Sequence, residues 1–410
     1  MKNIDVLTPA SPAITPDELA QKLQVMRQAK RPAPFASKLM KLTEQFSRRL
    51  LEDREARGWP ELQVLGFWLR NAALEAMKKD FTQKPETISV PQGIVFHIPP
   101  ANVDTMFAYS LFMSLLCGNA NVIRMPSRRG GAMTLLLRIL DEVFSGAVAP
   151  KDQLLIIGYE HDDEITEIIS KSADLRVIWG GDKTVDTIRQ IPLSPWGREL
   201  VFPDRFSWSA FDVAAYRTLN DMAKDKLAEQ YFNDLFWFDQ AGCASPRVVL
   251  WRGAVTTSIT DDFYKRVANV VEDKRWKLDV GINAMKQTRN YGAMADYSIT
   301  AKRDFGPALT IFSMKDLGDL KAIRDTPCFG GTLFEISIRD LSDIVPHIEK
   351  RDQTLTHFGF EKTELESFVH ALNEHSFDRL VPIGQALSFN AVWDGYDLLQ
   401  NFTRLVTIQR

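Results

Sequence analysis

The chain has 410 residues, a formal net charge of −3, 45% hydrophobic residues and 25% charged residues. This length exceeds what one ordinary hydrophobic core accommodates, so we expect two or three domains of a soluble globular protein. The slightly acidic balance lacks the basic excess of nucleic-acid-binding proteins. Three widely spaced cysteines, Cys117, Cys243 and Cys328, argue for a reducing compartment and against a disulfide framework.

The N-terminus lacks the apolar stretch and small-residue cleavage site of a secretory signal. The most apolar run, residues 106–117, is shorter than the ~20 residues that a membrane-spanning helix needs. We therefore expect a cytoplasmic protein with no membrane span. The first twenty residues are rich in Pro, Ser and Thr, and we expect them to be partly disordered.

Helices are predicted over most of the first ninety residues. Thr15 caps one, and apolar residues at three- and four-residue spacing predict two more at 36–57 and 60–80. From Ser89 the pattern alternates, with strands in GIVFHI, NANVIRM, DQLLIIG and LRVIWG. The predicted helices span 103–117, 134–144 and 163–170, and a further helix begins near Lys183. This alternation predicts βαβ units in a doubly wound parallel sheet, which binds ligands at the carboxyl ends of its strands.

A second α/β segment follows Phe238, with strands in RVVLW, ALTIFSM and TLFEISI. We therefore expect a helical N-terminal segment at 1–88, a nucleotide-binding domain at 89–238, a cysteine-containing domain at 239–375 and a C-terminal return at 376–410.

Cys243 lies among small residues in DQAGCASP, between a predicted helix end and a strand. Such a loop exposes a thiolate to substrate and lets backbone N–H groups face a developing oxyanion. The alternative is a buried structural cysteine, which is common for a lone cysteine.

Asn102 lies in HIPPANVDT, after a strand and ahead of a helix. It is a candidate either for the helix N-cap or for the donor to an oxyanion. We interpret His97, on the strand itself, as a core histidine rather than a base.

Two further turns follow strands. GNANVIRMPSRRGG places cations and a hydroxyl beyond a strand end: Arg124, Ser127, Arg128 and Arg129. They suit an adenosine phosphate, or they form a solvated charged loop. In VIWGGDKT, Gly180 and Gly181 open a helix whose dipole favours a pyrophosphate. The chain has no G-x-G-x-x-G, P-loop, H-E-x-x-H or G-x-S-x-G motif.

In this order the segments resemble the aldehyde dehydrogenase superfamily, most closely the acyl-CoA reductase family typified by the fatty-acid reductase of bacterial luminescence (LuxC). IPPAN resembles the superfamily's P-W-N turn, NVIRMPS its N-x-V-x-K-P-S strand end, and VIWGGD stands at its F-T-G-S. DQAGCASP resembles the G-Q-x-C loop, and RDFGPALTIF resembles E-x-F-G-P-V-L. VIWGGDKTVDTIRQIPL, FPDRFSWSAF and VPIGQALSFNAVWDGYDL resemble the luminescence reductases, and the resemblance covers residues 85–410.

The resemblance implies an α/β, aldehyde dehydrogenase-like fold with two doubly wound Rossmann-type domains, the helical N-terminal segment and a small oligomerisation element. Cys243 would be the nucleophile and Asn102 the oxyanion donor. Residues facing the cofactor would be Arg124, Ser127, Arg128, Arg129, Gly180, Gly181 and Phe305.

The implied reaction is NADPH-dependent reduction of an acyl-CoA or acyl-protein thioester to an aldehyde through S-acyl-Cys243, without a metal. The arginines favour NADPH over NADH, because a 2′-phosphate needs cationic partners. An acyl-protein synthetase partner and a homo-oligomer are also implied, with the last ten residues as an intersubunit strand.

The positions at which the sequence departs from the superfamily motifs favour one reaction, thioester reduction, over the others. FPDRFSW occupies the place of E-L-G-G-K, which carries the water-activating base, and an acyl-enzyme without that base survives long enough for thioester reduction. Arg303 replaces the acid of E-x-F-G-P, which puts the nicotinamide-ribose contact in doubt, and the chain is shorter than typical luminescence reductases. The alternatives are aldehyde oxidation, acyl phosphate reduction, or a non-catalytic subunit of a fatty-acid reductase complex.

Overall fold

The computed structural model describes residues 3–81, 86–127, 129–146, 152–372 and 377–409. The chain forms two compact units, one of residues 1–204 with 389–410 and one of residues 205–388. This division differs from the expected one. The boundary expected after residue 238 falls inside the second unit, because β9 (Phe206–Asp212) pairs with β10 (Pro246–Arg252) in one sheet.

The first unit contains a seven-stranded sheet in the order β2-β1-β6-β5-β4-β7-β8. The strands β6, β5, β4, β7 and β8 are parallel, as the alternating sequence predicts. The bounds are β1 Ile4–Thr8, β2 Ala10–Ile14, β4 Ile94–Ile98, β5 Ala120–Met125, β6 Leu154–Gly158, β7 Leu175–Trp179 and β8 Arg198–Phe202.

The pairing of β1 and β2 corrects the expectation of disorder in the first twenty residues, of which the structure describes all but the first two. β1 pairs antiparallel with both β2 and β6. Ile4, Val6 and Ile14 are buried in the core of the unit. These three apolar side chains order the segment despite its Pro, Ser and Thr content, because their burial offsets the cost of fixing the backbone.

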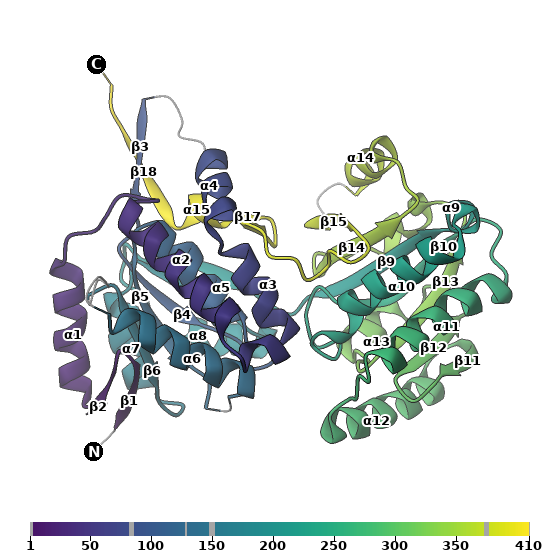
Figure 1. Ribbon diagram of the computed structural model, residues 1–410, viewed down its shortest axis with the longest axis horizontal. Coiled ribbons are helices and arrows are strands. Elements are labelled where there is room, and N and C mark those ends of the chain that lie inside the picture. Colours follow the sequence, from purple (N-terminus) through teal and green to yellow (C-terminus); the bar gives the residue numbers. More distant parts are fainter. Residues whose placement is uncertain (1–2, 82–85, 128, 147–151, 373–376, 410) are drawn as a thin grey trace. The chain divides into compact units, whose positions relative to one another are not determined.

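Helices account for most of the remaining chain of the first unit (Figure 1). Thr15 is the N-cap of α1, as predicted, and it forms a reciprocal capping box with Glu18. The helix predicted at 36–57 ends earlier, because the Asp53 carboxylate accepts from Glu55 N and Ala56 N and starts a short 3-10 turn. The bounds are α1 Pro16–Gln28, α2 Ser37–Glu52, η1 Ala56–Gly58, α3 Pro60–Trp68, α4 Asn71–Asp80, α5 Met106–Leu116, α6 Gly131–Phe144, α7 Asp163–Ser172 and α8 Asp182–Arg189.

The second unit contains another seven-stranded sheet, in the order β11-β12-β13-β10-β9-β14-β15. Only β11 is antiparallel to its neighbour, and the expected strands correspond to β10, β12 and β13. The remaining strands are β11 Ile299–Phe305, β12 Leu309–Met314, β13 Thr332–Ile338, β14 Asp352–Phe358 and β15 Arg379–Pro382. The helices are α9 Val213–Thr218, α10 Asp221–Phe236, α11 Thr257–Asp273, α12 Val280–Asp296, α13 Leu320–Asp325, η2 Leu341–His347 and α14 Lys362–Ala371.

The C-terminal return begins at Phe389 rather than at residue 376. It comprises β16 Val392–Trp393, β17 Tyr396–Asp397, α15 Leu398–Asn401 and β18 Thr403–Thr407. β18 pairs antiparallel with β3 (Thr87–Pro91) of the same chain, and the two strands extend side by side from the first unit (Figure 1). The intersubunit strand therefore has an intrachain partner, and its pairing across a subunit boundary stays a prediction. Every helix within the described ranges is too short or too polar to traverse a lipid bilayer.

Candidate active site

Cys243 lies in the loop of residues 237–245, here called the cysteine loop, between α10 and β10. Asp239 and Gln240 both have left-handed backbone, with φ of 48° and 64°. Residues other than Gly, Asn and Asp rarely adopt this conformation, and proteins keep it where surrounding contacts hold it. At Gln240 the loop is thus held in a shape that the residue itself does not favour.

Gln240 supplies those contacts and is fully buried. Its Oε1 accepts from Gly331 N at 3.0 Å and Thr332 N at 3.1 Å. Its Nε2 donates to the carbonyls of Pro246 and Thr332, each at 2.8 Å. One amide therefore fastens the cysteine loop to the beginnings of β10 and β13.

Cys243 is partly exposed, whereas Cys117 and Cys328 are buried. Burial raises the pKa of the Cys117 thiol, and it raises the pKa of Cys328 to about 12. Nε2 of Gln353 donates to the Cys243 sulfur at 3.4 Å, and Oγ of Ser207 donates to the Cys243 carbonyl at 2.8 Å. Accessibility and a hydrogen-bond donor at the sulfur suit the nucleophile that the sequence predicts.

Asn102 lies in the turn after β4, at the point where the strand order of the first sheet reverses. β5 and β6 lie on one side of β4, while β7 and β8 lie on the other. Ligands of open α/β sheets bind in the crevice at such a switch point. Asn102 is exposed there, and the N-cap of α5 is Thr105. The N-cap alternative is therefore wrong, and the role of oxyanion donor stays a prediction.

His97 lies on β4 and is a core histidine, as predicted. Its Nδ1 is 2.8 Å from Ser110 Oγ, and its Nε2 is 3.0 Å from Asn121 Oδ1. Burial lowers the pKa of His97 to about 4.

Arg124 and Arg129, here called the arginine pair, lie beside the carboxyl end of β6. The Arg124 guanidinium lies 4.8 Å from the ring centroid of Tyr159. An added Cβ at Gly158 would come within 2.9 Å of Arg129 Nη2. Within the described residues, the buried Nε of Arg124 has no hydrogen-bond partner.

Ser127 is exposed in the same turn. Arg128, also predicted to face the cofactor, lies outside the described residues. The turn is therefore more than a solvated loop, since Arg124 is partly buried with a donor still to be satisfied.

Gly180 and Gly181 follow β7, and Gly181 is the N-cap of α8. The Asp204 carboxylate already lies at this helix N-terminus, where it accepts from Asp182 N at 3.1 Å. Asp204 N in turn donates to Asp182 Oδ1 at 3.2 Å. The sequence did not reveal this contact, since Asp204 comes 22 residues later in the chain. A phosphate at this turn would have to displace or repel that carboxylate.

Phe305 ends β11, where its ring packs 5.6 Å from the ring of Tyr264. Arg303, which replaces the acid of the superfamily motif, forms ion pairs with Asp261 and Glu335. Arg303 is therefore engaged by acids of its own unit. The predicted contact of Phe305 with a cofactor remains untested.

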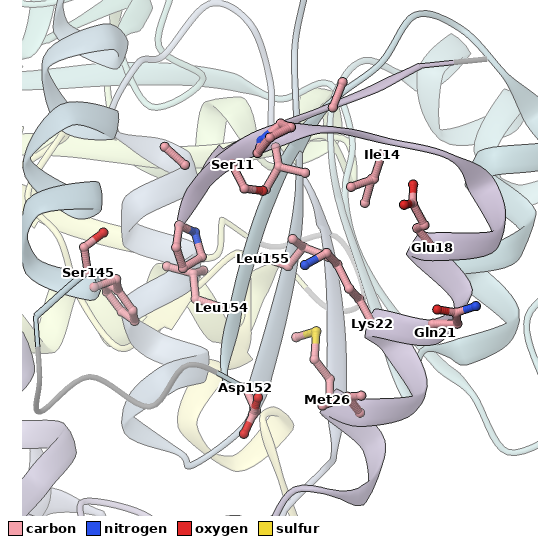
Figure 2. A pocket seen from close by; sticks show the side chains of 17 residues that line it. Ser11, Ile14, Glu18, Gln21, Lys22, Met26, Ser145, Asp152, Leu154 and Leu155 are labelled. Atoms are coloured by element: carbon pink, nitrogen blue, oxygen red, sulfur yellow. The ribbon is translucent and has the colours of Figure 1, made fainter. Parts of the chain in front are cut away.

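A cavity of about 890 Å³ lies elsewhere in the first unit, among β1, β2, α1 and the beginning of β6 (Figure 2). Lys22 extends from α1 over it toward Leu155, with Glu18 and Asp152 nearby (Figure 2). Leu154 and Leu155, which line it, lie at the amino end of β6, while the arginine pair lies at the carboxyl end. The cavity is therefore separate from the residues predicted to bind the cofactor.

Known structures share this fold across nearly the whole chain. An oxidoreductase from Marinobacter aquaeolei superposes with a TM-score of 0.68 at 15% identity, covering 100% of this chain and 95% of its own. Aldehyde dehydrogenase 21 from Physcomitrella patens, in complex with succinate, gives a TM-score of 0.68 at 11% identity, covering 97% and 91%. Glyceraldehyde-3-phosphate dehydrogenase GapN from Methanocaldococcus jannaschii, complexed with NADP, gives 0.67 at 14% identity, covering 100% and 99%.

These likenesses confirm the aldehyde dehydrogenase-like fold. No curated protein matches the chain in sequence. The family model described as acyl-CoA reductase (LuxC) matches residues 70–405. The chain therefore belongs to the acyl-CoA reductase (LuxC) family.

Proposed function

We propose that this protein reduces a fatty acyl thioester, on coenzyme A or on a protein, to an aldehyde through an S-acyl-Cys243 intermediate. Membership of the LuxC family makes the chain an oxidoreductase of the aldehyde dehydrogenase superfamily. The observation that carries the finer proposal is Cys243, a partly exposed thiol on a clamped loop with an amide donor at its sulfur. A nucleophile of this kind divides acyl transfer and reduction into two steps.

The thiolate of Cys243 attacks the carbonyl carbon of the thioester. The backbone N–H of Cys243 and the side-chain amide of Asn102 donate to the oxyanion. The bond from carbon to the carrier sulfur then breaks, and the carrier leaves as a thiolate that takes up a proton. When the acyl group has been reduced, the bond from carbon to the Cys243 sulfur breaks, which releases the aldehyde and restores the thiolate.

A nicotinamide cofactor, when bound, supplies the hydride for this reduction. The arginine pair fits the 2′-phosphate of NADPH, because Arg124 Nε is buried with its donor unsatisfied and Arg129 reaches Gly158 at the same end of β6. The NADP complex of GapN supports the same choice by analogy. Asp204 weighs against a phosphate directly on α8, so we place the recognised phosphate at the arginine pair and expect Gly180 and Gly181 to face less charged parts of the cofactor.

Thioester reduction requires an acyl-enzyme that water does not destroy. Two described side chains that hydrogen-bond Cys243 are the amide of Gln353, at the sulfur, and the hydroxyl of Ser207, at the carbonyl. Neither is a base that activates water near neutral pH. Together with FPDRFSW, which stands where the superfamily has its water-activating base, they favour reduction of a thioester over hydrolytic aldehyde oxidation. The proposal includes a cytoplasmic homo-oligomer supplied by an acyl-protein synthetase, as the family resemblance implies.

The test is to incubate the protein with acyl-CoA thioesters of increasing chain length, first without and then with NADPH or NADH. We expect an acyl adduct on the Cys243 peptide in mass spectra without cofactor, and aldehyde with NADPH. Cys243→Ser should abolish both, while Cys328→Ser, at a buried thiol, should retain both.

Two outcomes oppose the proposal. Acylation of Cys243→Ser at another residue would remove Cys243 from the mechanism. Faster turnover of free aldehyde with NADP, or of an acyl phosphate with NADPH, would assign the protein to one of the other superfamily reactions.

A further inference from the structure

Gln353 is a buried amide at Cys243, the one cysteine of the described residues that is partly exposed. It lies on β14 and is fully buried, and its Nε2 is 3.4 Å from Cys243 Sγ. The two residues are 110 positions apart in the sequence. Burying a polar side chain costs free energy unless its hydrogen bonds are made, so the position of the Gln353 amide beside the sulfur needs an explanation.

The path of β14 explains how Gln353 reaches the sulfur. Asp352 lies opposite Phe206 on β9 and Thr354 lies opposite Ser207, so the residue between them is an extra one in the ladder. A β-bulge of this kind bends the strand and redirects a side chain, and bulges are common next to active sites. Asp352 accepts a hydrogen bond from Trp208, and Leu355 packs in the same core cluster as Trp208, so both side chains lie on one face of the sheet. In a regular strand, two residues that are three positions apart lie on opposite faces. The bulge accounts for this difference and leaves the Gln353 side chain outside the regular alternation of faces.

The residue ahead of the bulge is firmly held. Asp352 is fully buried and accepts from Trp208 Nε1 at 2.7 Å, Arg324 Nη2 at 2.6 Å and Glu349 N at 2.8 Å. These bonds fix the backbone that carries Gln353. The position of the Gln353 amide is thus set by the fixed backbone of β14 and not by the rotamers of its side chain.

A second irregularity lies on the other side of β9. Pro246 of β10 lies opposite Ser207 and Val248 lies opposite Trp208, so Arg247 is the extra residue there. Arg247 Nη2 donates to the carbonyl of Gln240 at 3.1 Å. Two bulged strands therefore flank Ser207. In β10, Arg247 binds the backbone of the cysteine loop at Gln240, and in β14, Gln353 presents its amide to the Cys243 sulfur.

We propose that Gln353 is a catalytic residue that stabilises the Cys243 thiolate by donating a hydrogen bond to Sγ. The inference rests on the proposed function for its place in acyl transfer. A donor to the charged form of an acid favours that form. An amide remains neutral at every working pH, so it assists the thiolate without becoming a base toward water.

The test measures the alkylation of Cys243 by iodoacetamide in the intact protein as a function of pH, quantified on the Cys243 peptide. Gln353→Leu removes the donor at similar size, and Gln353→Glu places a carboxylate at nearly the same position. The matched control is Gln153→Leu, since Gln153 is buried in the first unit and donates to the Gly118 carbonyl.

We expect the alkylation midpoint to rise by about one pH unit or more in Gln353→Leu, which is about tenfold slower alkylation at neutral pH. Gln353→Glu should raise it further, and Gln153→Leu should leave it unchanged. Profiles of both Gln353 variants that coincide with the wild type would overturn the proposal. If Gln353→Leu does not fold, Gln353→Met, which also lacks a donor and is of similar size, decides in its place.

The readout needs no acyl substrate, so the two proposals fail separately. A shifted alkylation profile in a protein that leaves acyl-CoA unchanged would support Gln353 and refute the proposed reaction. An unshifted profile in a protein that forms aldehyde would do the reverse.

Discussion

Gln240 provides a strong test of how the cysteine loop is held. The change Gln240→Leu keeps the approximate size of the side chain and removes all four of its hydrogen bonds, to Gly331 N, Thr332 N, Thr332 O and Pro246 O. Because the side chain is fully buried, water cannot replace them. An unsatisfied buried group costs ~1 kcal/mol or more, so the four together predict a loss of about 4 kcal/mol in the free energy of unfolding. That is a large share of the ~5–15 kcal/mol that stabilises a typical protein.

The assay is urea unfolding followed by tryptophan fluorescence, since Trp208 and Trp251 are fully buried in the same unit. Hydrogen exchange of the backbone amides of residues 331 and 332 directly reports their hydrogen bonds to Gln240, here called the clamp. Gln153→Leu is the matched control, because its Nε2 makes one long bond of 3.4 Å to Gly118, and we expect it to cost about 1 kcal/mol. Equal losses in the two variants, with unchanged exchange at 331 and 332, would refute the clamp.

Three more predictions concern the first unit. Arg124→Ala should raise KM for NADPH about tenfold or more and leave KM for NADH nearly unchanged, as measured by steady-state kinetics; equal effects on both would remove the 2′-phosphate from this site. Burial lowers the pKa of His97 from 6.5 to about 4, so the unfolded chain binds more protons between these values, and stability is lost as pH falls through them. His97→Gln should reduce that loss by up to about 3 kcal/mol, seen as a flatter dependence of the urea midpoint on pH from 6.5 to 4. Deleting residues 403–410 removes β18 and should shift the protein to a smaller species in sedimentation, whereas an unchanged mass would exclude β18 from the subunit interface.

The strands β4 to β7 were predictable because they are short, apolar and separated by helices of regular period. β9 and β14 were not, because FSWSAFD and DQTLTHF carry polar residues that are nonetheless buried. Ser207, Gln353 and Thr354 are each fully buried. A hydrophobic pattern cannot identify strands whose polar side chains are satisfied by tertiary contacts.

The candidate site residues likewise divide into those that could be predicted from the sequence and those that could not. Cys243, Asn102 and the arginine pair stood out because each lies in a short motif after a strand or a helix. Gln353 and Asp204 were missed because each contacts its partner from a distant position within its own unit, 110 residues from Cys243 and 22 from Asp182. No local motif reports such a pairing, since it depends on strand register and on a bulge.

The composition of the first unit from two stretches of chain has a consequence for how the protein is made. Asn119 Nδ2 donates to the Phe402 carbonyl at 2.9 Å, and Gln92 Nε2 donates to the Thr403 carbonyl at 2.7 Å. Residues 205–388 leave the ribosome before Phe402 and Thr403 do, so the second unit is available to fold while the first still lacks these partners. The seven-stranded sheet of the first unit lies within residues 4–202, yet the unit as a whole is completed only when its C-terminal return has been synthesised.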